Sequence, residues 1–286
     1  MKKDSEWLYE ITPKNNLLEL NFKEIWRYRD LLMLFVKRDV ITLYKQTILG
    51  PLWYIIQPLF TSVIFTLVFN NIASIPTNGV PPFLFNLVGI TAWNYFKDCL
   101  VNTSDTFKKN EAIFGKVYFP RVIMPMSIVV SNLLKFGIQL VIFFCFYSYF
   151  VFTGLEVILT YQLLYLPLII ISMGLLGLGL GMIISSMVTK YRDLTFLIAF
   201  GVQLLMYLSA VMYPVQIAID KLPKQLSWVI EYNPMTKIIE AFRNIILGLD
   251  EVSLAHIVYT LIISFMLFLI GLLVFNRAEK TFIDTV

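Results

Sequence analysis

Long stretches without any charged residue dominate the chain. Residues 46–96 contain no Asp, Glu, Lys or Arg, and similar charge-free stretches cover residues 136–155, 157–189, 194–219 and 252–276. A bilayer hydrocarbon core is about 30 Å thick, so about 20 mainly apolar residues of helix cross it, and a charge at its centre is costly. The pattern therefore predicts membrane-spanning helices.

Division of these stretches at turn-forming residues gives six expected spans, at residues 52–70, 83–104, 122–152, 163–188, 194–213 and 254–275. The first stretch must contain two of them, because turn formers cluster between its apolar halves at Asn70, Asn71, Pro76, Asn78, Gly79, Pro81 and Pro82. The third expected span is long enough to tilt or to project from the bilayer.

Three segments are predicted not to cross. Residues 21–45 alternate aromatic and aliphatic with basic side chains, as in a helix that lies in the cytoplasmic interface, either as a plain anchor or as a gate. Residues 107–121 are short, charged and partly aromatic, so they form either a solvated turn or a loop that docks onto a partner. In the loop 215–253, Asn233 and Pro234 read as an N-cap and first helical residue, and apolar stripes follow with helical spacing. This loop is expected to be a helical hairpin that dips into the outer interface and could close a pore.

The predicted fold class is therefore an all-α integral membrane protein. It has six transmembrane helices, an N-terminal amphipathic interfacial helix and a re-entrant helical hairpin before the last span. Residues 1–51 form the cytoplasmic tail and interfacial helix, and residues 52–286 form the transmembrane domain.

The Lys and Arg residues orient these spans. Eighteen of the 23 fall in the segments on one side, namely 1–51, 97–121, 190–192 and 277–280. Basic loops stay in the cytoplasm, so both termini are expected there. Lys135 lies inside the third span, where it is either an amine that reaches the interface or a polar lining of a conduit.

Composition agrees with a membrane location. Hydrophobic residues make up 58% of the 286 residues, charged residues 15%, and the mean hydropathy is +0.75, which excludes an ordinary soluble fold. The net charge of +4 comes from loops beside spans and does not indicate nucleic acid. The polar start of the chain lacks the pattern of a cleaved signal peptide.

The sequence does not contain a group of the residue types that catalysis usually requires. The chain has one histidine, His256, two distant cysteines, and no close acidic pair within a span. We expect no catalytic residue, no bound metal and no cofactor in this chain. The single Gly115-Lys116 pair has Asn110 where a phosphate-binding loop needs its first glycine, so ATP is not expected to be hydrolysed here. The glycines between 174 and 181 lie in a charge-free span and indicate close helix packing.

Several separated blocks resemble the permease subunits of type-2 ABC exporters that move lipid-linked polysaccharides, the Wzm and TarG group. The most specific block joins residues 26–32, Arg38-Asp39, residues 44–53 and Gln57-Pro58. Further support comes from residues 79–83, Gly89 with Trp93, residues 114–121, residues 191–194, Tyr213-Pro214, and residues 233–236 with Arg243. The resemblance covers residue 20 to the end.

The resemblance implies a homodimer with a channel at its interface and two separate ABC ATPase subunits on the cytoplasmic side, which bind the ATP and Mg. Residues 107–121 become the coupling loop for the ATPase, with contacts expected from Phe114, Gly115, Lys116, Tyr118, Phe119, Tyr191, Arg192 and Asp193. The cytoplasmic gate is assigned to Arg38, Asp39, Tyr44 and Lys45, and the outer gate to Asn233, Pro234, Phe242 and Arg243.

Sugar rings stack on aromatic rings, so aromatic side chains near the spans are candidates for the channel lining. With Lys135, these candidates are Trp53, Tyr54, Phe83, Trp93, Tyr95, Phe96, Tyr147, Tyr149 and Tyr207. The ordinary alternative for each is an interfacial belt or lipid-facing position. The leading functional hypothesis is export of an O-antigen-like or teichoic-acid-like glycan across the bacterial cytoplasmic (inner) membrane. The alternatives are a small ion-coupled secondary transporter or channel, and an accessory of a membrane glycosyltransferase.

Overall fold

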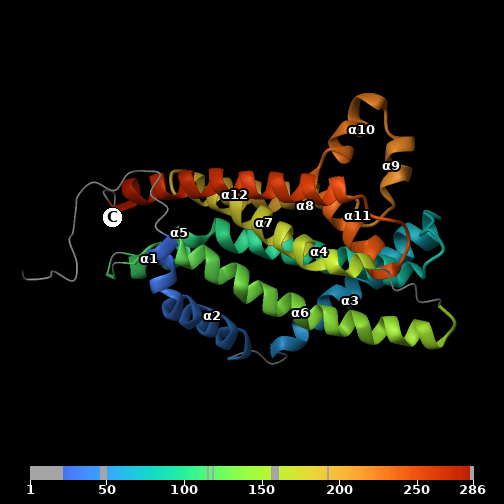
Figure 1. Cartoon of the computed structure of the whole chain (residues 1–286), viewed down its shortest axis with the longest axis horizontal. Coiled ribbons are helices and arrows are strands. Elements are labelled where there is room, and N and C mark those ends of the chain that lie inside the picture. The colour runs from blue at the N-terminus through green and yellow to red at the C-terminus, as the bar shows by residue number, and fades with distance from the viewer. Residues whose placement is uncertain are drawn as a thin grey trace, which may run out of the picture.

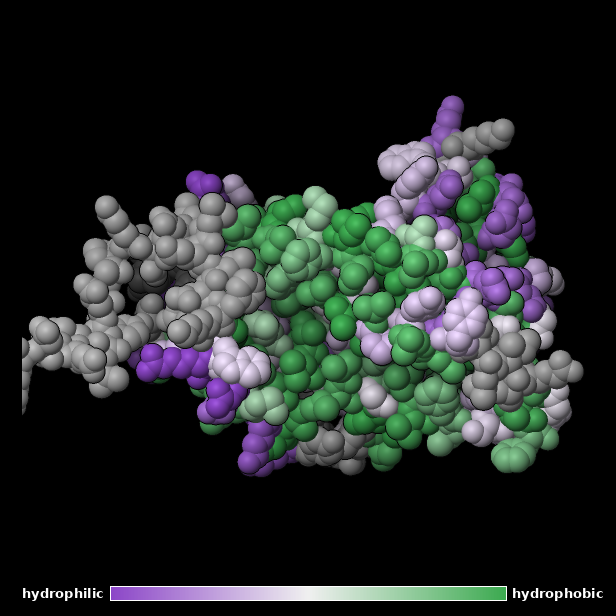
Figure 2. Space-filling view, in the orientation of Figure 1, coloured by the Kyte–Doolittle hydropathy of each residue, from purple (hydrophilic) through white to green (hydrophobic). Residues whose placement is uncertain are grey.

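The computed structural model describes residues 22–45, 50–114, 116–117, 119–155, 161–191 and 193–283, and within these ranges it is built from helices without strands. The long helices run roughly parallel to the longest axis of the molecule (Figure 1). Hydrophobic residues form a broad band across the face shown in Figure 2, between hydrophilic groups toward the two ends. This distribution fits a bilayer whose normal follows the long axis.

Two short helices precede the bundle, α1 (Phe22–Arg27) and α2 (Arg29–Tyr44). A 3-10 turn at Gly50–Leu52 leads into α3 (Trp53–Phe65), which continues as a π-helical segment, Thr66–Ile72. The side chain of Asn86 on α4 donates to Asn70 Oδ1 at 2.8 Å and to Thr66 Oγ1 at 3.1 Å. These hydrogen bonds tie the widened segment to the core of the bundle.

The centre of the bundle is α4 (Pro82–Ser104), which packs against α3, α6, α7 and α11. Proline at the first position of α4 fits because the first amides of a helix need no intrahelical partner. The neighbouring elements are α5 (Thr106–Phe114), α6 (Ile123–Phe152), a 3-10 turn at Tyr161–Tyr165, and α7 (Leu166–Val188).

The last part of the chain contains α8 (Leu194–Leu208), α9 (Val215–Lys221), α10 (Lys224–Glu231), α11 (Pro234–Leu247) and α12 (Leu254–Ile283). Helices α9 and α10 project from one end of the bundle as a small hairpin (Figure 1) around the buried residues Ala210, Val215 and Ile230. Helix α11 begins where Asn233 Oδ1 accepts a hydrogen bond from the Met235 amide, as the sequence predicted, and ends at Gly248 in the left-handed region.

Four helical segments within the described residues are long and apolar enough to cross a membrane: Trp53–Ile72, Ile123–Phe152, Tyr161–Val188 and Leu254–Ala278. They coincide with the first, third, fourth and sixth expected spans. The second expected span is the 23-residue helix α4, and the fifth is α8, an apolar helix of 15 residues. Helix α8 ends at Leu208, five residues earlier than expected, because the backbone turns at Ala210, whose φ is +50°.

The closest helix contact joins α7 and α12. A Cβ placed on Gly271 would lie 2.3 Å from the carbonyl oxygen of Gly179, and one on Gly179 would lie 2.6 Å from the backbone of Leu267. Small residues allow this approach in lipid, where helices gain stability from close packing. The expectation that the glycines of residues 174–181 serve packing fits this arrangement.

Candidate functional site

The predicted coupling residues divide into buried and exposed ones. Phe114 and Phe119 are 5% and 4% exposed, and both belong to a cluster with Phe35 of α2 and Phe107 of α5. The Phe114 and Phe119 ring centroids are 5.9 Å apart, and those of Phe35 and Phe119 are 5.7 Å apart. These rings therefore hold the loop to α2 and the bundle, and do not form its outer surface.

The exposed side of the same region is formed by other residues. Lys116 and Val117 are exposed, and so are Tyr191 and Asp193 in the connection between α7 and α8. Lys190 Nζ lies 5.4 Å from the ring centroid of Tyr191. Gly115, Tyr118 and Arg192, which were also predicted to contact a partner, lie outside the described residues.

The predicted cytoplasmic gate lies on α2. Arg38 Nη2 is 2.8 Å from Asp39 Oδ1, and its guanidinium lies 5.0 Å from the ring centroid of Phe35. Because Phe35 also contacts Phe119, one face of α2 is joined to the coupling loop. Lys45 is exposed, and the side chain of Tyr44 lies outside the described part of the structure.

The predicted outer-gate residues surround the bend between α8 and α9. Asn233 Nδ2 donates to Ser209 Oγ at 3.2 Å, directly after α8, and Pro234 opens α11. Phe242 is buried, with its ring centroid 5.9 Å from that of Phe136 on α6.

Arg243 holds the most enclosed charge of this region. Its Nη2 donates to the carbonyl oxygen of Val211 at 2.7 Å, and its guanidinium lies 3.7 Å from the ring centroid of Phe85. Burial lowers the pKa of Arg243 to about 9, against an opposing effect of Glu240, so the guanidinium stays charged at pH 7. A cation on an aromatic face is stabilised most when water is excluded, as it is here. The side chain thus fixes α11 to α4 and to the bend after α8.

Three of the predicted channel aromatics lie in the core of the subunit. Trp93, Tyr95 and Phe96 on α4 are at most 4% exposed. Tyr95 packs 5.0 Å from Phe136, centroid to centroid, and Trp93 packs against Phe96. In this structure they face neighbouring helices and not an open surface.

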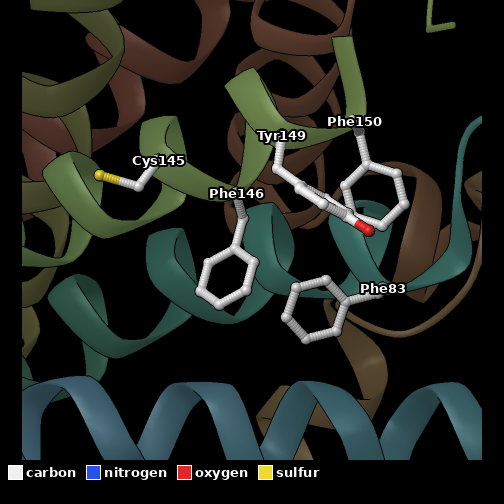
Figure 3. A pocket seen from close by; sticks show the side chains of 5 residues that line it. All are labelled: Phe83, Cys145, Phe146, Tyr149 and Phe150. Carbon is white, nitrogen blue, oxygen red and sulfur yellow. The ribbon is translucent and has the colours of Figure 1, made fainter. Parts of the chain in front are cut away.

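The other channel candidates lie nearer the surface. Trp53, Tyr149 and Tyr207 are exposed, and Tyr54, Phe83, Lys135 and Tyr147 are partly exposed. Lys135 Nζ lies 5.2 Å from the ring centroid of Tyr54. Phe83 of α4 and Tyr149 of α6 belong to an apolar pocket of about 380 Å³, whose lining is completed by Cys145, Phe146 and Phe150. Figure 3 shows the four rings gathered together and the sulfur of Cys145 to one side.

The described residues show no group of three or more His, Cys, Asp or Glu that could hold a metal. What they offer instead is a helical bundle with α2 and α5 toward one end and the small hairpin of α9 and α10 toward the other (Figure 1).

Some residues of these sites were not singled out from the sequence. Phe85 and Val211 complete the surroundings of Arg243, and their roles depend on contacts between segments far apart in the chain. Phe85 lies four residues before Gly89, so both residues share one face of α4. This spacing was the sequence signal that could have pointed to Phe85.

This architecture is that of a helical membrane protein, and comparison with known sequences defines its class. Residues 30–247 match the model of the ABC-2 type transporter family, and the chain belongs to this family.

The chain is similar to an O-antigen export system permease protein RfbA of Klebsiella pneumoniae, with 29% identity over 260 residues, which cover 89% of this chain and 94% of the relative. A second Klebsiella pneumoniae protein of the same name is 27% identical over 257 residues, with the same coverage of both chains. The Myxococcus xanthus protein of that name is 24% identical over 224 residues, which cover 78% of this chain and 82% of the relative.

Proposed function

We propose that this chain is the channel-forming permease subunit of an ABC exporter that moves a lipid-linked polysaccharide across the bacterial cytoplasmic membrane. The observation that carries the proposal is the similarity to O-antigen export permeases along 89% of this chain. A glycan of the O-antigen or teichoic-acid type, attached to a polyprenyl carrier, is the substrate class.

The transmembrane part consists of six crossings in this proposal. Besides the four apolar segments, α4 and the apolar helix α8 are the other two crossings. The 23 residues of α4 are long enough for a core about 30 Å thick. With six crossings, the basic loops support a cytoplasmic position for both termini. The α9–α11 region then lies on the outer side, where it closes the exit.

Two copies form the channel. Helix α8 exposes Phe196, Leu197 and Phe200, and α3 exposes Phe60 and Ile64. Helix α8 has few contacts within its own subunit, so its apolar surface is available to the second copy or to lipid. Trp53 begins α3 and Tyr207 lies in the last turn of α8, so these two channel candidates belong to the helices whose exposed surfaces the second copy would cover.

Energy comes from a separate ATPase subunit in this proposal. The exposed residues Lys116, Val117, Tyr191 and Asp193 form its docking surface, and the buried Phe114 and Phe119 hold that surface in place. Because Phe119 also contacts Phe35, a movement of the coupling loop is passed to α2, the cytoplasmic gate.

The proposal is tested by co-expressing the chain with a candidate ABC ATPase subunit and purifying the complex. A lipid-linked glycan should raise the rate of ATP hydrolysis above the rate with the free lipid carrier. Equal rates with the glycan-bearing lipid, the free carrier and no lipid would contradict the proposed substrate class.

A further inference from the structure

A polar cleft of about 370 Å³ opens between α2, α4, α5 and α6, apart from the aromatic pocket of Figure 3. Each of the four helices contributes polar residues, among them Arg38 and Asp39 of α2, Asn102 of α4, Lys109 of α5 and Asn132 of α6. Such polar surface is costly in a membrane protein unless water or a ligand satisfies it. The volume lies in the range of pockets that bind small molecules.

The charges of the cleft are unevenly compensated. Arg38 is paired with Asp39, and Lys109 Nζ is 3.2 Å from Asp105 Oδ2. Lys135 also lines the cleft, but in the described part of the chain no carboxylate lies within 4 Å of its Nζ. Asp98 and Asp39 are the nearby acidic groups that act on it electrostatically. The cleft therefore contains a cation without a close counter-ion.

The floor of the cleft can donate hydrogen bonds to an anion. Asn132 is 2% exposed, and the one hydrogen bond described for its amide nitrogen is a 4.0 Å contact with the sulfur of Cys99, a weak acceptor. Asn102 lines the same space. An amine and two amides around one space form a donor set suited to phosphate oxygens.

The position of Lys135 corresponds to the depth of lipid headgroups under the proposed orientation. The residue lies twelve positions after Ile123, about 18 Å along the axis of α6, which at 30 residues is longer than the hydrocarbon core. Helical side chains point toward the N-terminus, which brings Nζ closer to the cytoplasmic surface. Its neighbour Tyr54 is the second residue of α3, at the cytoplasmic start of that helix. The anion that a membrane supplies at this level is a lipid phosphate.

We propose that the cleft between α2, α4, α5 and α6 is a binding site for the phosphate group of a membrane lipid, with Lys135 as its cationic contact. Two kinds of membrane lipid could supply this phosphate, namely a polyprenyl diphosphate and an anionic phospholipid. Only the choice of the polyprenyl diphosphate rests on the proposed function. Because the cleft joins α2 to α5, an occupant would contact both the gate helix and the coupling segment.

The test measures lipid binding to the purified full-length chain by native mass spectrometry in a neutral detergent. The probes are undecaprenyl diphosphate, phosphatidylglycerol and, as the lipid without phosphate, diacylglycerol. The variant Lys135→Gln is compared with Lys37→Gln, which removes the same charge from an exposed position of α2 outside the cleft. Lys135→Arg restores the charge.

We expect the wild-type chain and Lys37→Gln to bind at least one phosphate-bearing lipid more tightly than diacylglycerol. Lys135→Gln should bind that lipid about tenfold more weakly than the wild-type chain. Lys135→Arg should recover most of this loss of affinity. A larger effect on undecaprenyl diphosphate identifies the carrier as the occupant, and a larger effect on phosphatidylglycerol identifies bulk phospholipid. Equal binding by Lys135→Gln and Lys37→Gln for both lipids would overturn the proposal.

A second pair of variants covers the case in which Lys135→Gln does not fold. Thr42 is exposed at the rim of the cleft. Thr42→Glu should weaken phosphate-lipid binding, and Thr42→Gln, of similar size and without charge, should not; equal binding by the two would also overturn the proposal. The lipid-binding experiment needs neither the ATPase nor a glycan, so it is independent of the proposed function. If lipid binding is intact but the chain does not support glycan export in cells, only the proposed function is contradicted.

Discussion

Arg243 lies directly against the backbone of Gly89. A Cβ built on Gly89 would be 2.5 Å from Arg243 Nη2 and 2.6 Å from the carbonyl oxygen of Val211. No other residue type leaves room for the guanidinium between α4 and the bend that follows α8. The contact therefore makes the position of the α9–α11 region depend on one glycine in the core.

The first prediction concerns this glycine. Gly89→Ala should displace the guanidinium and destabilise the protein by about 1–3 kcal/mol, the usual cost of overpacking a core. Thermal unfolding in detergent should show a lower Tm. The control is Gly201→Ala in α8, where an added Cβ meets nothing within 4 Å. An unchanged Tm for Gly89→Ala would show that Arg243 moves aside without cost.

The second prediction concerns Arg243 itself. Arg243→Gln removes the donor to Val211 O and the cation above Phe85, and a buried group left without its hydrogen bond costs about 1–3 kcal/mol. Arg243→Lys keeps the charge but lacks the planar fork, so its loss should be smaller. Unfolding midpoints and limited proteolysis of the α9–α10 hairpin report both effects. Identical behaviour of the two variants would show that charge has no part in the contact.

The third prediction concerns the contact of α7 with α12. Gly271→Ala places a methyl group 2.3 Å from Gly179 O, so the helices must separate and the folded state should lose about 1–3 kcal/mol. Gly137→Ala in α6, where nothing lies within 4 Å, serves as the matched control. Yield of monodisperse protein and Tm are the measurements. Equal Tm values for Gly271→Ala and Gly137→Ala would contradict the close packing described above.

The fourth prediction separates support from contact in the coupling loop. Phe119→Ala removes a buried ring, which costs about 3–5 kcal/mol, so stability and ATPase docking should fall together. Val117→Asp changes an exposed side chain, so docking should fall while Tm stays within a degree or two of wild type. Co-purification with the ATPase and thermal unfolding are measured for both. Full docking by Val117→Asp would remove this face from the proposed interface.

The sequence indicated the elements of the fold better than their contacts. The charge-free stretches located the four apolar spanning segments, and the capping pair Asn233-Pro234 located the start of α11 to the residue. These features are local, since they depend on hydropathy and on backbone groups within one turn. The early end of α8 was missed because it depends on the conformation of Ala210, a residue without any turn preference.

The hydropathy pattern did not predict which side chains point toward neighbouring helices. Helix α4 is apolar on several sides and is buried among α3, α6, α7 and α11, so Trp93, Tyr95 and Phe96 lie inside the subunit. A helix that is hydrophobic all round gives no periodic signal that distinguishes protein neighbours from lipid. Phe114 and Phe119 lie in a segment that mixes charged and aromatic side chains, and only their shared cluster with Phe35 and Phe107 shows that they point inward.

The central claim is that this chain forms only the conduit and that a separate subunit supplies the energy. It is tested most directly in proteoliposomes that contain a lipid-linked glycan, with the chain reconstituted alone or with its ABC ATPase subunit. We predict glycan translocation only when the ATPase subunit and ATP are both present, and none by the chain alone under a proton or sodium gradient. Gradient-driven translocation by the chain alone would contradict the claim.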